Sequence, residues 1–114
     1  MSVTPDDSGL ADEDAKLLIL ARTSRARSGA AEGAAVRDNM GRTYAAASVA
    51  LPSLRLTALQ AAVAAAVSSG ADRLEAAFVV SDSDALGDAD RAVLADLGVA
   101  TVLLAAPDGT LRAR

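Results

Sequence analysis

The segment of residues 54–69 constrains the fold more than any other part of the chain, because almost every side of it is apolar. Leu56, Leu59, Val63 and Val67 recur at helical spacing and predict a helix with a buried stripe. The other faces carry alanine instead of polar residues: Ala58, Ala61, Ala62, Ala64, Ala65 and Ala66. A helix that is apolar all round needs cover on more than one side. We therefore expect it to lie against a sheet on one side and against more protein on another.

Helices and strands alternate along the rest of the chain. We expect helices over residues 12–28 and 88–97, the second capped by Asp88, and strands over residues 33–37, 43–49, 74–81, 99–105 and 110–112. This alternation predicts an α/β fold, a three-layer α-β-α sandwich with a mixed sheet. We expect one domain over residues 10–114, preceded by a flexible acidic tail over residues 1–9.

The composition argues against several classes of function. The 114 residues contain neither cysteine nor histidine, so disulfides, thiol chemistry and a tight zinc site of the usual kind cannot be built. We expect no cofactor. A formal net charge of −4 argues against a nucleic-acid partner. No stretch is long and apolar enough to span a bilayer, and the N-terminal residues do not form a secretory signal, so we expect a soluble, cytoplasmic protein.

Three short framework segments carry a resemblance to a known family. They are Gly33-Ala34-Ala35-Val36, Gly41-Arg42-Thr43-Tyr44 and Ala76-Ala77-Phe78-Val79-Val80. Together with the order of helices and strands, they resemble the small homotetrameric cytidine deaminases over residues 15–109. The resemblance implies a cytidine deaminase-like sandwich. It also implies a zinc ion held by cysteine and histidine, a glutamate that shuttles protons, and an Asn-x-Glu element that grips the ribose.

The positions that the resemblance assigns to this site do not carry the family's residues. They are Ser48, Ala50, Thr57, Leu59, Gly87 and Asp90. The first two stand for the ribose-gripping Asn and Glu, and the last two for a pair of cysteines. Thr57 stands for the first zinc ligand and Leu59 for the proton-shuttling Glu. A hydroxyl and a single carboxylate would hold zinc weakly, so the resemblance implies a degenerate member of the family without zinc.

Other residue groups could still carry a function. Ser48, Thr57, Asp88 and Asp90 could serve another chemistry in the same pocket, although a hydroxyl nucleophile needs a base such as histidine. The acidic run over residues 82–90 could attract a divalent cation, although its spacing matches no calcium loop. An anionic ligand could bind a group of arginines: Arg22, Arg25, Arg27, Arg37 and Arg42. The simpler interpretations are semi-buried hydroxyls, a solvated loop before a helix, and a charged solvent face.

The sequence predicts a catalytically inactive, cytidine deaminase-like protein that acts as an oligomeric binding or scaffold protein. The alanine-coated helix favours a homodimer or homotetramer, with these interface candidates: Ala58, Ala61, Ala62 and Ala65. A nucleoside-like ligand and an unidentified protein partner both stay open. The alternative is a nucleoside or nucleotide salvage enzyme of the same family with altered chemistry. A conventional zinc cytidine deaminase comes third.

Overall fold

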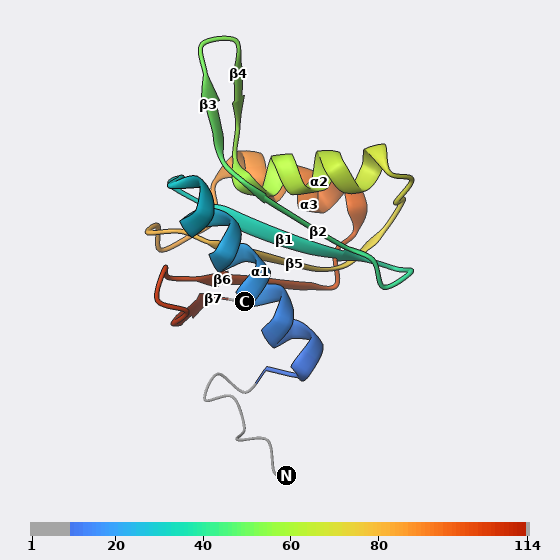
Figure 1. Ribbon diagram of the computed structural model, residues 1–114. Helices are drawn as coiled ribbons and strands as arrows, with labels where there is room; N and C mark the ends of the chain where they lie inside the picture. Colours follow the sequence, from blue (N-terminus) through green and yellow to red (C-terminus); the bar gives the residue numbers. More distant parts are fainter. Residues whose placement is uncertain (1–9, 114) are drawn as a thin grey trace.

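A five-stranded mixed sheet forms the centre of the protein, and helices cover both of its faces (Figure 1). The structure is a computed structural model that describes residues 10–113, so the expected tail over residues 1–9 lies outside the described residues. In chain order the elements are α1 (Asp12–Ser28), β1 (Gly33–Asp38), β2 (Thr43–Ala47), β3 (Val49–Leu51), β4 (Leu54–Leu56), α2 (Ala58–Ser68), β5 (Leu74–Val80), α3 (Asp88–Leu97), β6 (Thr101–Ala105) and β7 (Leu111–Ala113). Within the described part of the chain, no helix is long and apolar enough to cross a membrane.

The strands of the sheet follow the order β2-β1-β5-β6-β7. β1 pairs antiparallel with both β2 and β5, β5 runs parallel to β6, and β7 returns antiparallel at the far edge. Phe78, at the centre, lies between Ala35 of β1 and Leu103 of β6. The mixed sheet predicted from the alternation of helices and strands is confirmed.

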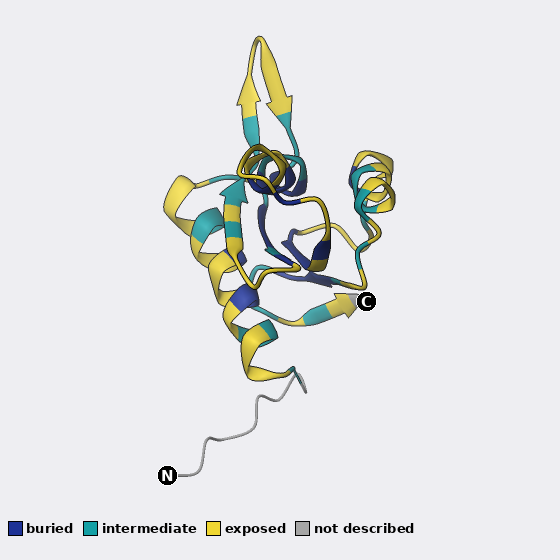
Figure 2. Cartoon of the chain, turned by 90° about the vertical axis from the view of Figure 1, so that its right-hand side faces the viewer, coloured by how far each residue is buried: buried dark blue, intermediate teal, exposed yellow. Residues whose placement is uncertain are grey.

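Two separate apolar cores lie on the two faces of the sheet. On one face, Leu17 and Leu18 of α1 pack with Phe78 and Leu103. On the other face, Leu59 of α2 packs with strand residues and with partly buried side chains of α3. Buried residues gather at the sheet between the helices, and the outer sides of the helices are exposed (Figure 2). The three-layer α-β-α sandwich is therefore confirmed.

Gly33 allows α1 to lie unusually close to β1. A β-carbon on Gly33 would stand 2.0 Å from the carbonyl oxygen of Ala21 and 2.9 Å from the Cβ of Arg25. Because no side chain fits between the two backbones, only glycine lets the helix pack at this distance. The framework match at residues 33–36 thus includes a position that this packing requires.

The expected helix over residues 54–69 begins four residues later, at Ala58. Residues 54–56 instead form β4, which pairs antiparallel with β3 in a hairpin that projects away from the sandwich (Figure 1). The helix starts where it does because Thr57 and Gln60 form a capping box. The Thr57 hydroxyl accepts from the Gln60 backbone N–H at 3.0 Å, and the Gln60 side chain accepts from the Thr57 N–H at 2.9 Å.

Within one chain, α2 is buried along one side only. Leu59, Ala62 and Val63 lie in the core, whereas Val67, which we expected in the buried stripe, is 48% exposed. Two of the interface candidates, Ala58 and Ala62, are fully buried in the core of the chain and so have no surface for a second copy. Ala65 is exposed and Ala61 is half-buried, so these two candidates remain on the surface.

The expectation that Asp88 caps the third helix is also wrong. The N-cap of α3 is Gly87, no side chain caps the helix, and Asp88 is its first residue. Gly98 ends α3 in the left-handed conformation, at φ 57°, as a glycine at this position allows. The strand that follows begins at Thr101, two residues later than expected.

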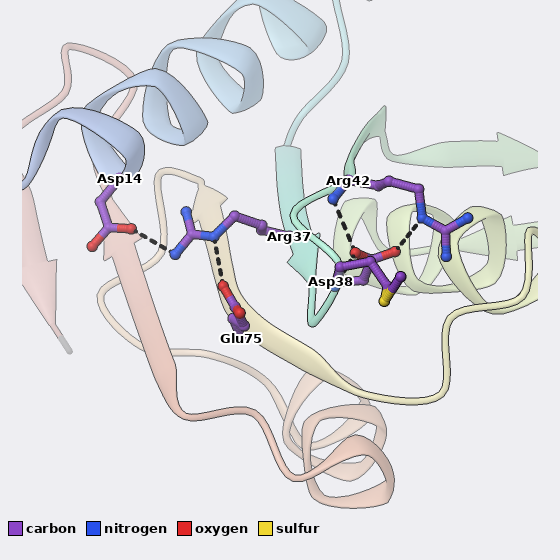
Figure 3. A network of polar contacts seen from close by, with 6 residues as sticks. Asp14, Arg37, Asp38, Arg42 and Glu75 are labelled. Atoms are coloured by element: carbon purple, nitrogen blue, oxygen red, sulfur yellow. Dashed lines mark hydrogen bonds and ion pairs between the residues drawn. The ribbon is translucent and has the colours of Figure 1, made fainter.

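A buried carboxylate fixes the turn between β1 and β2. Asp38 Oδ1 accepts from the backbone N–H groups of Met40 and Arg42, each at 2.9 Å, and Oδ2 accepts from Arg42 Nε at 2.9 Å and from the Tyr44 hydroxyl at 3.2 Å. Figure 3 shows the bonds from Arg42 to Asp38 beside a second network, in which Arg37 binds Asp14 and Glu75 at 3.1 Å each. Burial alone would raise the pKa of Asp38, but the donors from Arg42 and Met40 hold it below its ordinary value.

Candidate functional site

A cavity of about 440 Å³ opens between the base of the β3–β4 hairpin, the N-terminus of α2 and the loop after β5. Its lining includes these polar residues: Glu32, Ser48, Arg55, Thr57, Gln60, Ser81, Asp82 and Ser83. A smaller cavity of about 190 Å³ adjoins it, towards the N-terminus of α3. The two share Glu32, Thr57, Ser81 and Ser83 along their common wall. They therefore form one cleft with an outer and an inner part.

The fold brings five of the six sequence-predicted site residues to this cleft. Ser48 and Ala50 line the outer part, Gly87 and Asp90 the inner part, and Thr57 both. The sixth behaves differently. Leu59 is fully buried in the apolar core beneath α2 and lines neither cavity. The position that the resemblance assigns to a proton-shuttling glutamate is therefore a core position in this protein.

Thr57 and Asp90 are joined directly by their side chains. The Thr57 hydroxyl donates to Asp90 Oδ1 at 2.6 Å. Asp90 is only 3% exposed, and it lies in the first turn of α3. The N-terminus of a helix carries a partial positive charge, so this position favours a carboxylate. The bond connects the starts of two helices that lie on the same face of the sheet.

Ser48 has a structural role in the wall of the outer cavity. Its hydroxyl accepts from the Glu32 backbone N–H at 3.2 Å, and its own backbone N–H donates to the Glu32 carbonyl at 3.1 Å. These two bonds tie the residue between β2 and β3 to the residue before β1. The hydroxyl is thus already used in holding the cleft together.

Glu32 also lines the cleft, although it is not among the site residues predicted from the sequence. Its side chain is half-buried, lines both cavities, and makes no hydrogen bond or ion pair with the residues that the structure describes. Its position was the available signal, because it directly precedes the framework match at residues 33–36. Glu32 thus presents a free carboxylate to the cleft.

The acidic run over residues 82–90 does not converge on one point. Asp82 lies 4.0 Å from an arginine of α1, Asp84 pairs with an arginine of β7, and Asp88 lies 3.6 Å from Arg91. Over residues 10–113, no group of three or more His, Cys, Asp or Glu side chains is placed to hold a metal ion.

The arginines are dispersed as well. Arg22 donates to the carbonyl of Pro107, Arg25 to that of Ala31, Arg37 to two carboxylates and Arg42 to Asp38. The structure thus does not gather these four arginines into one anion site.

A mixed sheet between helices, with a cleft at the N-termini of two helices on one face, defines a protein of the deaminase sandwich class. The chain matches the family described as Cytidine deaminase-like over residues 10–109, and it belongs to that family. It is similar to the crystal structure of cytidine deaminase from Burkholderia pseudomallei, with 25% identity, a TM-score of 0.77 and 92% of each chain covered. The cytidine deaminase from Mycobacterium leprae is similar at 26% identity, with a TM-score of 0.64, 88% of this chain covered and 92% of that chain. Among curated proteins, no significantly similar sequence is found.

The family implies a zinc ion, and the residues at the place the resemblance assigns to it do not fit one. Zinc in proteins is held by thiolates, imidazoles and carboxylates. Here the three positions carry a hydroxyl at Thr57, no side chain at Gly87, and a carboxylate at Asp90 that is engaged by the hydroxyl. A neutral hydroxyl and one carboxylate make a weak ligand set. We therefore derive no reaction step through a metal ion.

Proposed function

We propose that this protein is a member of the cytidine deaminase-like family that does not deaminate cytidine, and that it acts as an oligomeric binding or scaffold protein. The observation that carries the proposal is the direct bond between Thr57 and Asp90, at two of the positions assigned to zinc ligands. Deamination in the family needs a metal-activated water and a glutamate that moves protons. Leu59 stands at the glutamate position and is buried in the core.

Assembly into a homodimer or homotetramer is part of the proposal. The surface side of α2 exposes three apolar residues, Ala64, Ala65 and Val67. The nearby hairpin exposes Leu51 and Leu54 at 54% and 47%. A two-stranded hairpin is marginally stable when it stands alone in water. Contact with a second copy would cover both the hairpin leucines and the alanine surface.

A small polar ligand is the first candidate for what the cleft binds. The outer cavity, at about 440 Å³, falls within the size range of small-molecule sites. The side chains of Arg55 and Glu32 line it and have no hydrogen-bond or ion-pair partner among the described residues, so a guanidinium and a carboxylate are both available to a ligand. Since the similar solved structures are cytidine deaminases, nucleosides are the first ligands to test. We place this role in the cytoplasm.

Three measurements on the purified protein test the proposal. Metal analysis with a cytidine and deoxycytidine deamination assay is expected to find neither stoichiometric zinc nor turnover. Light scattering on the eluted protein is expected to give a dimer or a tetramer. A thermal-shift screen with nucleosides would reveal a ligand. Turnover of cytidine with stoichiometric zinc would overturn the proposal that the protein is catalytically inactive. A stable monomer at micromolar concentration would overturn the proposal that it forms an oligomer.

The alternative, a salvage enzyme with altered chemistry, is favoured by one observation. The free carboxylate of Glu32 faces both parts of the cleft and is a candidate general base. Incubation with a panel of nucleosides and nucleotides, followed by mass analysis of the products, tests it. A product that forms with the wild type and not with Glu32→Gln would establish this alternative in place of the binding role.

A further inference from the structure

We propose that Thr57 and Asp90 form a metal-free clamp, which ties the N-terminus of α2 to the N-terminus of α3 at the place that the family resemblance assigns to zinc. The clamp concerns how the site is held together and not what it binds, so it goes beyond the proposed function. Three observations carry it: the hydrogen bond, the burial of Asp90 and the open space at Gly87.

The hydrogen bond joins two helices that have little else polar in common. Thr57 and Asp90 are 33 residues apart in the chain, and their oxygens stand 2.6 Å apart. A hydroxyl that donates to a carboxylate forms a short bond of this kind, stronger than one between neutral groups. Among the described residues, no other hydrogen bond or ion pair connects residues 57–68 with residues 88–97. The bond is thus the specific polar link between the two helices.

The burial of Asp90 indicates that the link is structural. The side chain of Asp88, two residues earlier, is fully exposed, whereas Asp90 is 3% exposed. A buried carboxylate is costly unless hydrogen bonds and nearby positive charge compensate it. Thr57 supplies the hydrogen bond, and the N-termini of α2 and α3 both supply partial positive charge. The single carboxylate of Asp90 therefore interacts favourably with the partial positive charge at the N-termini of both helices.

The bonded oxygens of Thr57 and Asp90 stand closer together than two thiolate ligands of one zinc ion would. Two thiolates on one tetrahedral zinc stand about 3.8 Å apart, because each Zn–S bond is about 2.3 Å long. An aspartate oxygen reaches one bond further from the backbone than a cysteine sulfur, and it closes the gap to Thr57 to 2.6 Å. At Gly87 an added β-carbon would meet no atom within 4 Å, and φ is −77°, which any residue adopts. The backbone thus leaves room for a third ligand that the sequence does not supply.

A double-mutant cycle on the full chain tests the link. Thr57→Val removes the donor but also the cap on Gln60, so its effect alone is not diagnostic. Thr57→Val and Asp90→Ala should each lower the melting temperature by roughly 5 °C. The melting temperature of the double variant should fall by clearly less than the sum of the two single decreases, because both changes break the same bond.

The matched control combines Thr57→Val with Asp88→Ala, and its two decreases in melting temperature should add. Additive effects in the Asp90 cycle would overturn the clamp, and Thr57→Ser, which keeps the hydroxyl, should preserve most of the stability.

A second measurement does not depend on whether these variants fold. The wild-type protein should keep its melting temperature when it is treated with EDTA, because no metal holds the helices. A fall in melting temperature that added zinc reverses would overturn the clamp. Turnover of cytidine would overturn the proposed function, which is a separate result from additivity in the cycle.

A gain of metal binding tests the geometry directly. Thr57→Cys/Gly87→Cys/Asp90→Cys should bind one Co²⁺ ion, seen as thiolate-to-cobalt charge-transfer absorption. The control is Thr57→Cys/Gly87→Cys/Asp88→Cys, whose third thiol would point to solvent, and it should show no such absorption. A folded triple variant at Thr57, Gly87 and Asp90 that binds no Co²⁺ would show that the clamp does not stand at a metal position.

Discussion

Gly33 lies against Ala21 so closely that a β-carbon at Gly33 would stand 2.0 Å from the Ala21 carbonyl oxygen. This contact sets the distance between α1 and the centre of the sheet. It joins residues from the first helix and the first strand, and both carry parts of the core that surrounds Phe78.

Gly33→Ala should therefore destabilise the protein by about 2–3 kcal/mol, because backbone atoms must shift to admit the methyl group. Urea unfolding followed by circular dichroism measures the change. Gly87→Ser is the matched control: its β-carbon meets no atom within 4 Å, and serine is a good N-cap, so its stability should be unchanged or slightly raised. A Gly33→Ala variant as stable as the wild type would contradict the close approach.

Asp38 should make stability depend on pH in the acid range. Although burial opposes it, the net shift of the Asp38 pKa is downward from its ordinary value, because Arg42 and Met40 donate to the carboxylate. A carboxylate with a lowered folded-state pKa stabilises the fold above its unfolded pKa of about 3.9, and the contribution disappears as pH falls through the folded value. The wild type should thus lose stability from about pH 5 downwards.

Asp38→Asn separates this contribution from that of the other carboxylates. The variant should be less stable than the wild type at pH 7, and the difference should shrink as the pH falls below 4, since only the wild type loses the ionised group. Asp84→Asn, at an exposed carboxylate, is the control and should follow the wild-type pH profile closely. A constant difference between Asp38→Asn and the wild type across the range would contradict the shift.

Leu59 should respond as a core residue. Leu59→Ala should cost about 2–5 kcal/mol of unfolding free energy. Leu59→Glu, which restores the family's residue type, should destabilise the fold more strongly and should yield no cytidine turnover, because the charge would be buried in the core beneath α2. Ala95→Glu, on the exposed side of α3, should change stability by less than about 0.5 kcal/mol. A stable Leu59→Glu variant would mean that this side chain can turn towards the cleft.

The exposed hairpin should matter for assembly rather than for folding of the subunit. Leu51→Ser/Leu54→Ser removes two exposed apolar side chains, so it should shift the protein towards monomer in light scattering with little change in its circular dichroism. Ile19→Ser is the control, because Ile19 is 58% exposed on α1, away from the hairpin. An unchanged oligomer in the double variant would exclude the hairpin from the interface.

Short-range patterns predicted the sandwich and the approximate positions of its main strands. The continuous apolar run at residues 76–80 became the buried β5, and α3 spans residues 88–97 as expected. The start of α2 was also available from the sequence, because Thr57 and Gln60 have the spacing of a capping box. The helical spacing of Leu56 obscured that signal, and β4 was assigned to the helix in consequence.

The chain by itself determined which residues form strands and helices, and it determined that no cysteine or histidine stands in the cleft, because both depend on residue type and near neighbours. Only the tertiary structure decided which polar groups meet. Asp88 and Asp90 look alike in the sequence, yet one is exposed and the other is buried against Thr57. Glu32 gained its place in the cleft in the same way. The physical reason is that these contacts depend on the packing of α2 and α3 on one face of the sheet, which brings together residues far apart in the chain.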